Sequence, residues 1–189
     1  MSNKTDTNKA KISFDACSIN EGFARMVVMG FMMDLNPTMD ELTDVKTAVS
    51  EAVTNAIIHG YEMEERETKI SREGELLADT EAIPQVEMQC LRKGNKLTVI
   101  IEDYGVGIGN VEEARQPFFT TKPDMERSGM GFSFMEAFMD EVEVVSKLGK
   151  GTRITMSKYI KSESCNLANP DTATGETSGV FGEEGCGEQ

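Results

Sequence analysis

Residues 50–60 read SEAVTNAIIHG and place three polar side chains, Glu51, Asn55 and His59, at four-residue steps. Side chains four residues apart lie on one face of an α-helix, so these three would form a polar stripe. The opposite side would be apolar, from Val49, Ala52, Val53, Ala56 and Ile57. Such a stripe by itself is typical of the solvated side of an amphipathic helix. Its meaning therefore depends on the motifs that follow it.

The composition indicates one acidic domain. The chain has 189 residues, which suits a single domain of ordinary size. Its formal net charge of −14 argues against direct nucleic-acid binding, which needs a concentrated basic surface. The cysteines, Cys17, Cys90, Cys165 and Cys186, form no C-x-x-C pair and have no histidine nearby, so we expect reduced thiols and no zinc site.

Membrane and export signals are not found in the sequence. It has no run of about 18 apolar residues that could span a bilayer. Its first residues, MSNKTDTNKAK, lack the apolar segment of a signal peptide. We therefore expect a soluble, cytoplasmic protein that does not bind a membrane.

The first half of the chain predicts a strand followed by two helices. Alternation at Ile12, Phe14 and Ala16 predicts a strand over 11–17, after a disordered N-terminus over 1–10. Ser18 with Glu21 forms a capping-box pattern for a first helix, which would end before Pro37. Its expected apolar face consists of Phe23, Met26, Val27, Gly30 and Phe31. Thr38 with Glu41 repeats the pattern for a second helix, which would carry the opening stretch to a C-terminal cap at Gly60.

The second half predicts two hairpins around a third helix. Alternating apolar residues over 86–101 surround the turn residues 93–95, and a second hairpin over 142–158 surrounds a turn over 149–151. Between them a helix would begin at 129–133 and bury Phe134, Ala137 and Phe138. This order predicts an α/β (α+β) two-layer sandwich, with a mixed, mainly antiparallel sheet and helices on one face.

Two segments contain too few apolar residues to form a hydrophobic core. Residues 62–83 are strongly acidic with few apolar side chains, which predicts an inserted loop. Residues 161–189 combine glycines and acidic residues with few apolar ones, which predicts a disordered tail. The folded domain is therefore expected over 11–160.

Two glycine-rich motifs follow the opening helix. Residues 103–109 read DYGVGIG directly after a predicted strand, and residues 127–132 read RSGMGF before a predicted helix. Glycines let backbone N–H groups approach phosphates closely. The first motif lacks the spacing of a Rossmann fingerprint, and the chain has no G-x-x-x-x-G-K-[ST] motif of a P-loop.

The combination of E-x-x-x-N on a helix, D-x-G-x-G after a strand and a later G-M-G resembles the GHKL, or Bergerat-fold, ATPase superfamily. Within it, residues 36–62 and 112–144 look like those of the sporulation anti-sigma F factors, a family of serine kinases from endospore formers. The resemblance extends over roughly 12–61 and 84–158.

The resemblance implies roles for single residues. Glu51 would be the catalytic base and Asn55 the Mg²⁺ ligand. Asp103 would accept the adenine amino proton, with Thr152 also at the adenine. The remaining nucleotide-binding residues would be Gly105, Gly107, Thr120, Thr121, Lys122, Ser128, Gly129, Met130, Gly131 and Phe132, with Arg127 as a catalytic phosphate contact.

The resemblance also implies the activity and the partners. The protein would bind and inhibit sporulation sigma factor F and phosphorylate a serine of an anti-anti-sigma factor with Mg²⁺ and ATP, as a homodimer. Arg25, expected to be exposed on the first helix, aligns with a partner-contacting position. The alternative is a nucleotide-gated sigma-binding module without productive phosphotransfer. His59 stays open between the rim of the site and structural packing.

Overall fold

A computed structural model describes residues 7–61, 84–117 and 129–161. In chain order the elements are β1 (Thr7–Asp15), α1 (Ile19–Met32), the 3₁₀ turn η1 (Met33–Leu35), α2 (Met39–Asn55), the π-helical turn η2 (Ala56–Gly60), β2 (Gln85–Lys93), β3 (Lys96–Glu102), α3 (Val111–Ala114), α4 (Gly131–Phe138), β4 (Glu141–Lys147) and β5 (Gly151–Tyr159). The predictions of an acidic loop over 62–83 and of a disordered tail lie outside these residues.

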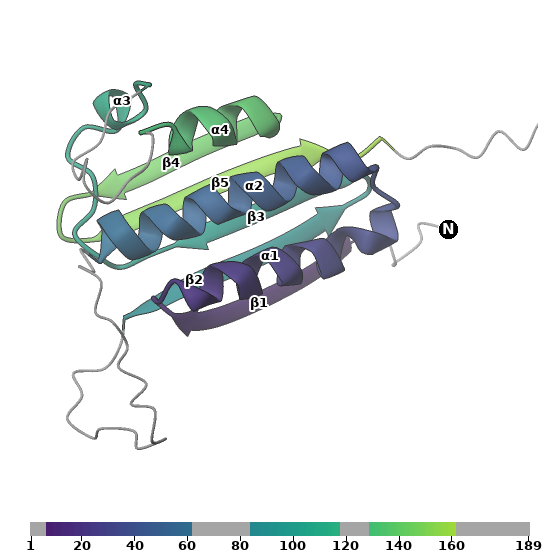
Figure 1. Cartoon of the computed structure of the whole chain (residues 1–189), viewed down its shortest axis with the longest axis horizontal. Coiled ribbons are helices and arrows are strands. Elements are labelled where there is room, and N and C mark those ends of the chain that lie inside the picture. Colours follow the sequence, from purple (N-terminus) through teal and green to yellow (C-terminus); the bar gives the residue numbers. More distant parts are fainter. Residues whose placement is uncertain (1–6, 62–83, 118–128, 162–189) are drawn as a thin grey trace, which may run out of the picture.

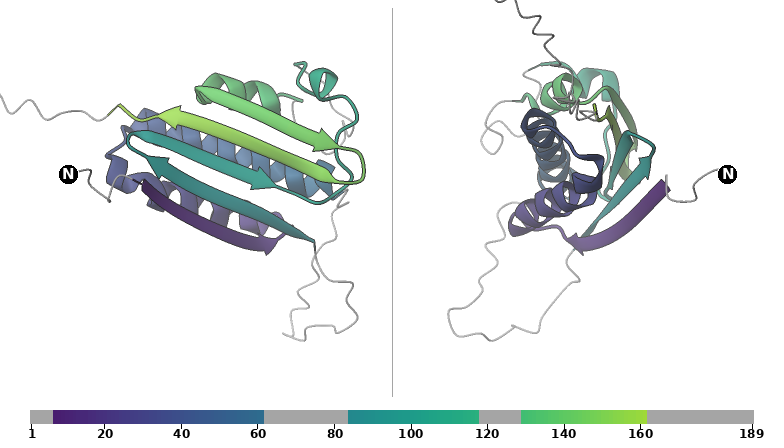
Figure 2. Two further views of the ribbon diagram at one scale, coloured as in Figure 1. Left: turned by 180° about the vertical axis from the view of Figure 1, so that it is seen from behind. Right: turned by 90° about the vertical axis from the view of Figure 1, so that its right-hand side faces the viewer.

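The strands form one sheet with the order β1-β2-β3-β5-β4. All four pairings between neighbouring strands are antiparallel, so the described sheet has no parallel pair of the kind that a mixed sheet contains. α1, α2 and α4 lie on one face, with α2 along the middle (Figure 1). The view along the layers shows helices on one side and the sheet on the other (Figure 2). The predicted two-layer α+β sandwich is confirmed.

β1 begins earlier than the sequence predicts. Thr7 pairs with Lys93, and the ladder continues to Asp15 opposite Gln85, so residues 7–10 are part of the edge strand and not of a disordered terminus. The side chains of residues 7–9 are exposed, which is why hydrophobic alternation gave no sign of them. Backbone hydrogen bonds to β2 hold this end of the strand without burying apolar surface.

α1 packs with a different face from the predicted one. Its buried residues are Ala24, Val28 and Met32, whereas Phe23 is 48% exposed and Met26 is 67% exposed. Almost every residue from 23 to 33 is apolar, so periodicity alone could not select the buried face. Small residues at the contact let α1 lie close to α2 and the sheet.

The two predicted capping boxes have different outcomes. At Thr38 the box is complete, because the Thr38 side chain accepts from Glu41 N–H and the Glu41 carboxylate accepts from Thr38 N–H. At Ser18 the prediction is wrong, because Ser18 has helical φ and ψ of −59° and −29° and makes no side-chain cap hydrogen bond. An N-cap side chain reaches the first turn only from extended backbone, which Thr38 adopts and Ser18 does not.

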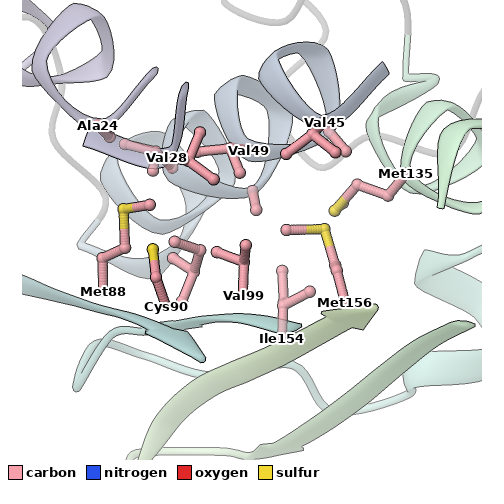
Figure 3. Packing of buried hydrophobic residues seen from close by; sticks show 14 of the residues in the cluster. Ala24, Val28, Val45, Val49, Met88, Cys90, Val99, Met135, Ile154 and Met156 are labelled. Carbon is pink, nitrogen blue, oxygen red and sulfur yellow. The ribbon is translucent and has the colours of Figure 1, made fainter. Parts of the chain in front are cut away.

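The core lies between α1, α2 and α4 and the inner face of the sheet. Val28 and Val49 face Met88, Cys90 and Val99 across the two layers (Figure 3). The buried residues of α4 are Gly131 and Met135, while the predicted Ala137 is exposed and Phe134 and Phe138 are half-buried and stacked on each other. Met135 lies one helical turn after Gly131, so the side of α4 that carries these two residues faces the sheet.

The described cysteines are reduced, as the sequence predicts. Cys17 and Cys90 are free thiols, and burial raises the pKa of Cys90 to about 12, so it behaves as a core side chain. Of the helices in the described ranges, none combines the length and hydropathy that a bilayer crossing requires.

The prediction of a helix over residues 38–60 is confirmed except that its last turn is π-helical.

Candidate functional site

The last turn of the central helix lies directly against the first glycine motif. Asn55 ends α2, and residues 56–60 continue as the π-helical turn η2. The Gly60 carbonyl accepts a hydrogen bond of 2.7 Å from Val106 N–H. A Cβ on Gly105 would lie 1.7 Å from the Gly60 carbonyl oxygen, so only glycine fits there. Backbone-to-backbone contact therefore fixes the glycine motif on the end of the helix.

Gly60 differs from the predicted C-terminal cap. Its φ is not positive, as a left-handed cap would require. What excludes a side chain is Asp103, because a Cβ on Gly60 would lie 2.8 Å from the Asp103 carboxyl carbon. The glycine is thus a contact residue between η2 and the end of β3.

Asp103 is a buried carboxylate at the end of β3. It is 4% exposed, and its oxygen Oδ1 accepts hydrogen bonds from Gly105 N–H at 3.0 Å and Thr152 N–H at 3.3 Å. Burial raises the pKa of Asp103, and these two hydrogen bonds oppose the rise only in part. The backbone N–H of Asp103 donates to Thr152 O at 2.9 Å, so β3 and β5 hold the two residues side by side.

The turn between β4 and β5 supports the other side of the glycine motif. Gly107 has a φ of +71°, and a Cβ there would lie 2.2 Å from Lys147 O. Gly149 N–H donates to Val106 O at 2.7 Å. The motif is therefore held between η2 and the β4–β5 turn, with no room for side chains at Gly105 or Gly107.

The second glycine motif meets the helical stripe. Gly131 begins α4, and a Cβ on it would lie 3.2 Å from Glu51 Oε2 and 3.3 Å from Asn55 Oδ1. The first N–H groups of a helix have no acceptor within it and carry the positive end of the helix dipole. Glu51 and Asn55 thus lie at the electropositive end of α4.

The structure brings most of the predicted residues into one region. Glu51 and Asn55 lie at one end of it beside Gly129, Met130, Gly131 and Phe132, and Asp103, Gly105, Gly107 and Thr152 lie at the other. The π-helical turn with His59, which is half-buried, connects the two ends. The predicted residues Thr120, Thr121, Lys122, Arg127 and Ser128 lie outside the described residues.

Two residues that the sequence reasoning missed hold this region in place. The Ser146 hydroxyl accepts from Ile108 N–H at 2.7 Å and lies 2.9 Å from the Thr152 hydroxyl. The Tyr61 hydroxyl donates to Gln85 O and accepts from Tyr104 N–H at 2.9 Å. A signal for Ser146 was present, because it is a polar residue at the next inward position after Val142 and Val144.

Arg25 is held by α2 and is less exposed than predicted. Its side chain is 34% exposed, and its guanidinium donates to Ser50 Oγ at 2.8 Å and lies 3.8 Å from Glu21. Ser50 precedes Glu51, so this hydrogen bond joins α1 to the part of α2 that carries Glu51 and Asn55.

The chain matches known proteins over most of its length. Residues 19–158 match the family model of the histidine kinase-like ATPase domain. An anti-sigma F factor of Clostridium perfringens is 50% identical over 155 residues, which cover 82% of this chain and 99% of that protein. One from Anoxybacillus flavithermus is 48% identical over 161 residues, which cover 84% and 99%.

A solved structure has the same fold. The crystal structure of the RsbU and RsbW domains of a Mycobacterium tuberculosis protein superposes with a TM-score of 0.53 at 16% identity, over 81% of this chain and 32% of that one. At this identity the likeness concerns the fold alone. Because the sequence relatives are matched over nearly their whole length at about half identity, the chain belongs to the histidine kinase-like ATPase family and, within it, to the anti-sigma F factors.

Proposed function

We propose that this protein is an anti-sigma factor with protein serine kinase activity, which uses Mg²⁺ and ATP to phosphorylate an anti-anti-sigma factor and which binds sporulation sigma factor F. The observation that carries the proposal is the position of Glu51 and Asn55 against Gly131, with the buried Asp103 in contact with Gly60 at the end of the same helical segment. The sigma factor is proposed as a partner because the relatives are named anti-sigma F factors.

The residues fit a nucleotide at both ends. Asp103 and Thr152 offer polar groups to the base. Gly105 and Gly107 would shape this end of the site by letting the motif lie directly against the backbone of Gly60 and Lys147. The N-terminus of α4, with Gly129, Met130, Gly131 and Phe132, would face the phosphates. Thr120, Thr121, Lys122, Arg127 and Ser128 would complete the phosphate contacts from the segment between α3 and α4.

Asn55 would hold the magnesium ion. An amide oxygen is the kind of ligand that Mg²⁺ takes, together with water and phosphate oxygens. When bound, Mg²⁺ neutralises charge on the transferring phosphoryl group. Phosphates bound at the N-terminus of α4 would bring the ion next to the Asn55 amide, which lies beside Gly131.

Glu51 would accept the proton of the attacking serine hydroxyl. Its carboxylate lies one turn before Asn55 and on the same side of α2, next to Gly131. Phosphoryl transfer needs positioning and charge stabilisation more than covalent chemistry, so an oriented carboxylate and a phosphate-binding arginine, Arg127, are suited to it.

The partners would bind near α1. Four apolar side chains on one side of α1 and η1 are largely exposed, at spacings of four, three and seven residues: Ile19 (77%), Phe23 (48%), Met26 (67%) and Met33 (59%). An apolar surface of this kind on a soluble protein marks a site of protein contact. We assign it to the sigma factor, the anti-anti-sigma factor or the second subunit of a homodimer, in the cytoplasm.

The decisive experiment is incubation with γ-labelled ATP, Mg²⁺ and the cognate anti-anti-sigma factor. Label on a serine of that protein is the expected result. Binding of ATP and of the sigma factor without any labelled protein would contradict the kinase and favour the nucleotide-gated binding module. Free labelled phosphate alone would indicate an ATPase.

A further inference from the structure

The Ser146 hydroxyl contacts three groups of the base end of the site. Ile108 N–H donates to Ser146 Oγ at 2.7 Å, and Ser146 Oγ donates to Gly151 O at 2.9 Å. The third contact, 2.9 Å, joins Ser146 Oγ and Thr152 Oγ1, and either hydroxyl could be its donor by distance alone. Ser146 therefore connects the first glycine motif to the start of β5.

Counting protons assigns the direction of the third hydrogen bond. A serine hydroxyl has one proton and two lone pairs. The proton is used for Gly151 O and one lone pair for Ile108 N–H, so only the second lone pair is left for Thr152. Thr152 must then donate, and its oxygen keeps lone pairs but no proton for any further partner.

Thr152 and Asp103 would then present the same kind of group to a ligand. The Asp103 carboxylate, when ionised, is an acceptor, and Thr152 N–H donates to it at 3.3 Å. With its proton committed to Ser146, the Thr152 hydroxyl is an acceptor as well. Two adjacent acceptors favour an exocyclic amine, which carries two N–H donors, and disfavour a carbonyl oxygen at the same position, which carries none.

We propose that Ser146 determines base specificity, by committing the Thr152 proton so that the site accepts a 6-aminopurine and rejects a 6-oxopurine. Ser146 is a positioning residue in this scheme, since it acts through Thr152. The inference rests on the proposed function, namely that a nucleoside triphosphate binds at Asp103 and Thr152.

The test compares the Kd of ATP with that of ITP, the matching 6-oxopurine nucleotide, for the full-length protein by calorimetry. The unmodified protein should prefer ATP. In Ser146→Ala the Thr152 hydroxyl is free to donate to a carbonyl oxygen, so ITP should bind more tightly. The ratio of the Kd of ITP to the Kd of ATP should therefore fall by about tenfold, the effect of one hydrogen bond. Ser146→Thr keeps a hydroxyl and should retain the original ratio.

Ser157→Ala is the matched control. Ser157 is also on β5 and pairs its hydroxyl with Thr98 Oγ1 at 3.0 Å, but it lies far along the strand from Thr152. The ratio of the Kd of ITP to the Kd of ATP should not change in this variant. If Ser146→Ala does not fold, Thr152→Val replaces it, because removing the Thr152 acceptor should lower the same ratio.

The outcomes separate this inference from the proposed function. If the ratio of the Kd of ITP to the Kd of ATP is unchanged in Ser146→Ala, or in its substitute Thr152→Val, Ser146 does not determine base specificity. Nucleotide binding as such would not be affected by that result. An equal fall in Ser157→Ala overturns it too, because the effect would then be one of general stability. If the unmodified protein binds neither nucleotide, the proposed function itself fails.

Discussion

Gly60 and Asp103 are in direct contact, since a Cβ on Gly60 would lie 2.8 Å from the Asp103 carboxyl carbon. Gly60 ends the helical segment that carries Glu51 and Asn55, and Asp103 ends β3. The missing side chain therefore sets how closely the helix approaches the buried carboxylate. In the proposed function, this contact fixes the distance between the base end and the phosphate end of the nucleotide site.

Gly60→Ala should weaken ATP binding. The added methyl group must displace either η2 or Asp103, and forced repacking of this kind costs about 1 to 3 kcal/mol. Calorimetric titration with ATP measures the effect. Gly30→Ala is the control, because a Cβ on Gly30 of α1 meets nothing within 4 Å. Equal ATP affinity in both variants would contradict the importance of the Gly60 contact.

Glu51→Gln should retain ATP binding and lose most phosphoryl transfer. The amide keeps the shape of the side chain beside Gly131 but cannot accept a proton, and general-base catalysis contributes about 10²- to 10⁴-fold. Single-turnover transfer to the anti-anti-sigma factor measures the loss. Glu112→Gln, on the exposed face of α3, should leave the rate unchanged. A normal rate in Glu51→Gln would remove the residue from the base role.

Asn55→Ala should raise the Mg²⁺ concentration needed for half-maximal ATP binding. The substitution removes the amide oxygen next to the N-terminus of α4 and leaves Glu51 in place. Titration of ATP binding against Mg²⁺ provides the measurement, and binding without Mg²⁺ should change little. An unaltered metal dependence would be evidence against Asn55 as the ligand.

Asp103→Asn should weaken ATP binding yet not destabilise the ligand-free protein at neutral pH. Burial raises the pKa of Asp103 in the folded state, so its contribution to stability is present at low pH and is lost as the pH rises through that pKa. Replacing the carboxyl with an amide removes this loss. Denaturant unfolding at about pH 7 and about pH 4 should show the variant gaining relative stability only at the higher pH.

Thr38→Ala and Ser18→Ala should differ in stability although the sequence predicts a capping box at both. Only Thr38 makes the box, so Thr38→Ala should lower the free energy of unfolding by about 1 kcal/mol and Ser18→Ala by much less. Paired denaturant melts at neutral pH provide the comparison. Equal losses would contradict the hydrogen bonding at these two helix ends.

Glu41 explains why the Thr38 box is a strong one. Burial alone would raise the pKa of Glu41, but hydrogen bonds from Lys161 N–H and from Thr38 lower it below its ordinary value. A lowered pKa means that the ionised carboxylate stabilises the fold above its unfolded pKa and that this stabilisation is lost as the pH falls through the folded pKa. The same carboxylate accepts a hydrogen bond from Lys161 N–H, so it joins the start of α2 to the second residue after β5.

The order of the five strands and of α1, α2 and α4 could be predicted from the sequence, but the short helix α3 was missed. Short-range signals were sufficient for these, such as the turn at Gly94, the Thr38 capping box and the D-x-G-x-G motif after a strand. The spacing of Glu51 and Asn55 placed them on one helix face because a helical turn is a local geometry. Their assignment to a nucleotide site came from the resemblance.

Which surfaces of these elements come into contact became known only from the three-dimensional structure. The buried face of α1, through Ala24 and Val28, depended on how closely α2 and the sheet could approach it, since apolar residues lie on nearly all sides of that helix. The contact of Gly60 with Asp103 and the hydrogen bond between Ser146 and Thr152 join different elements of the fold. No local pattern encodes such contacts, because their distances are set by packing across the whole domain.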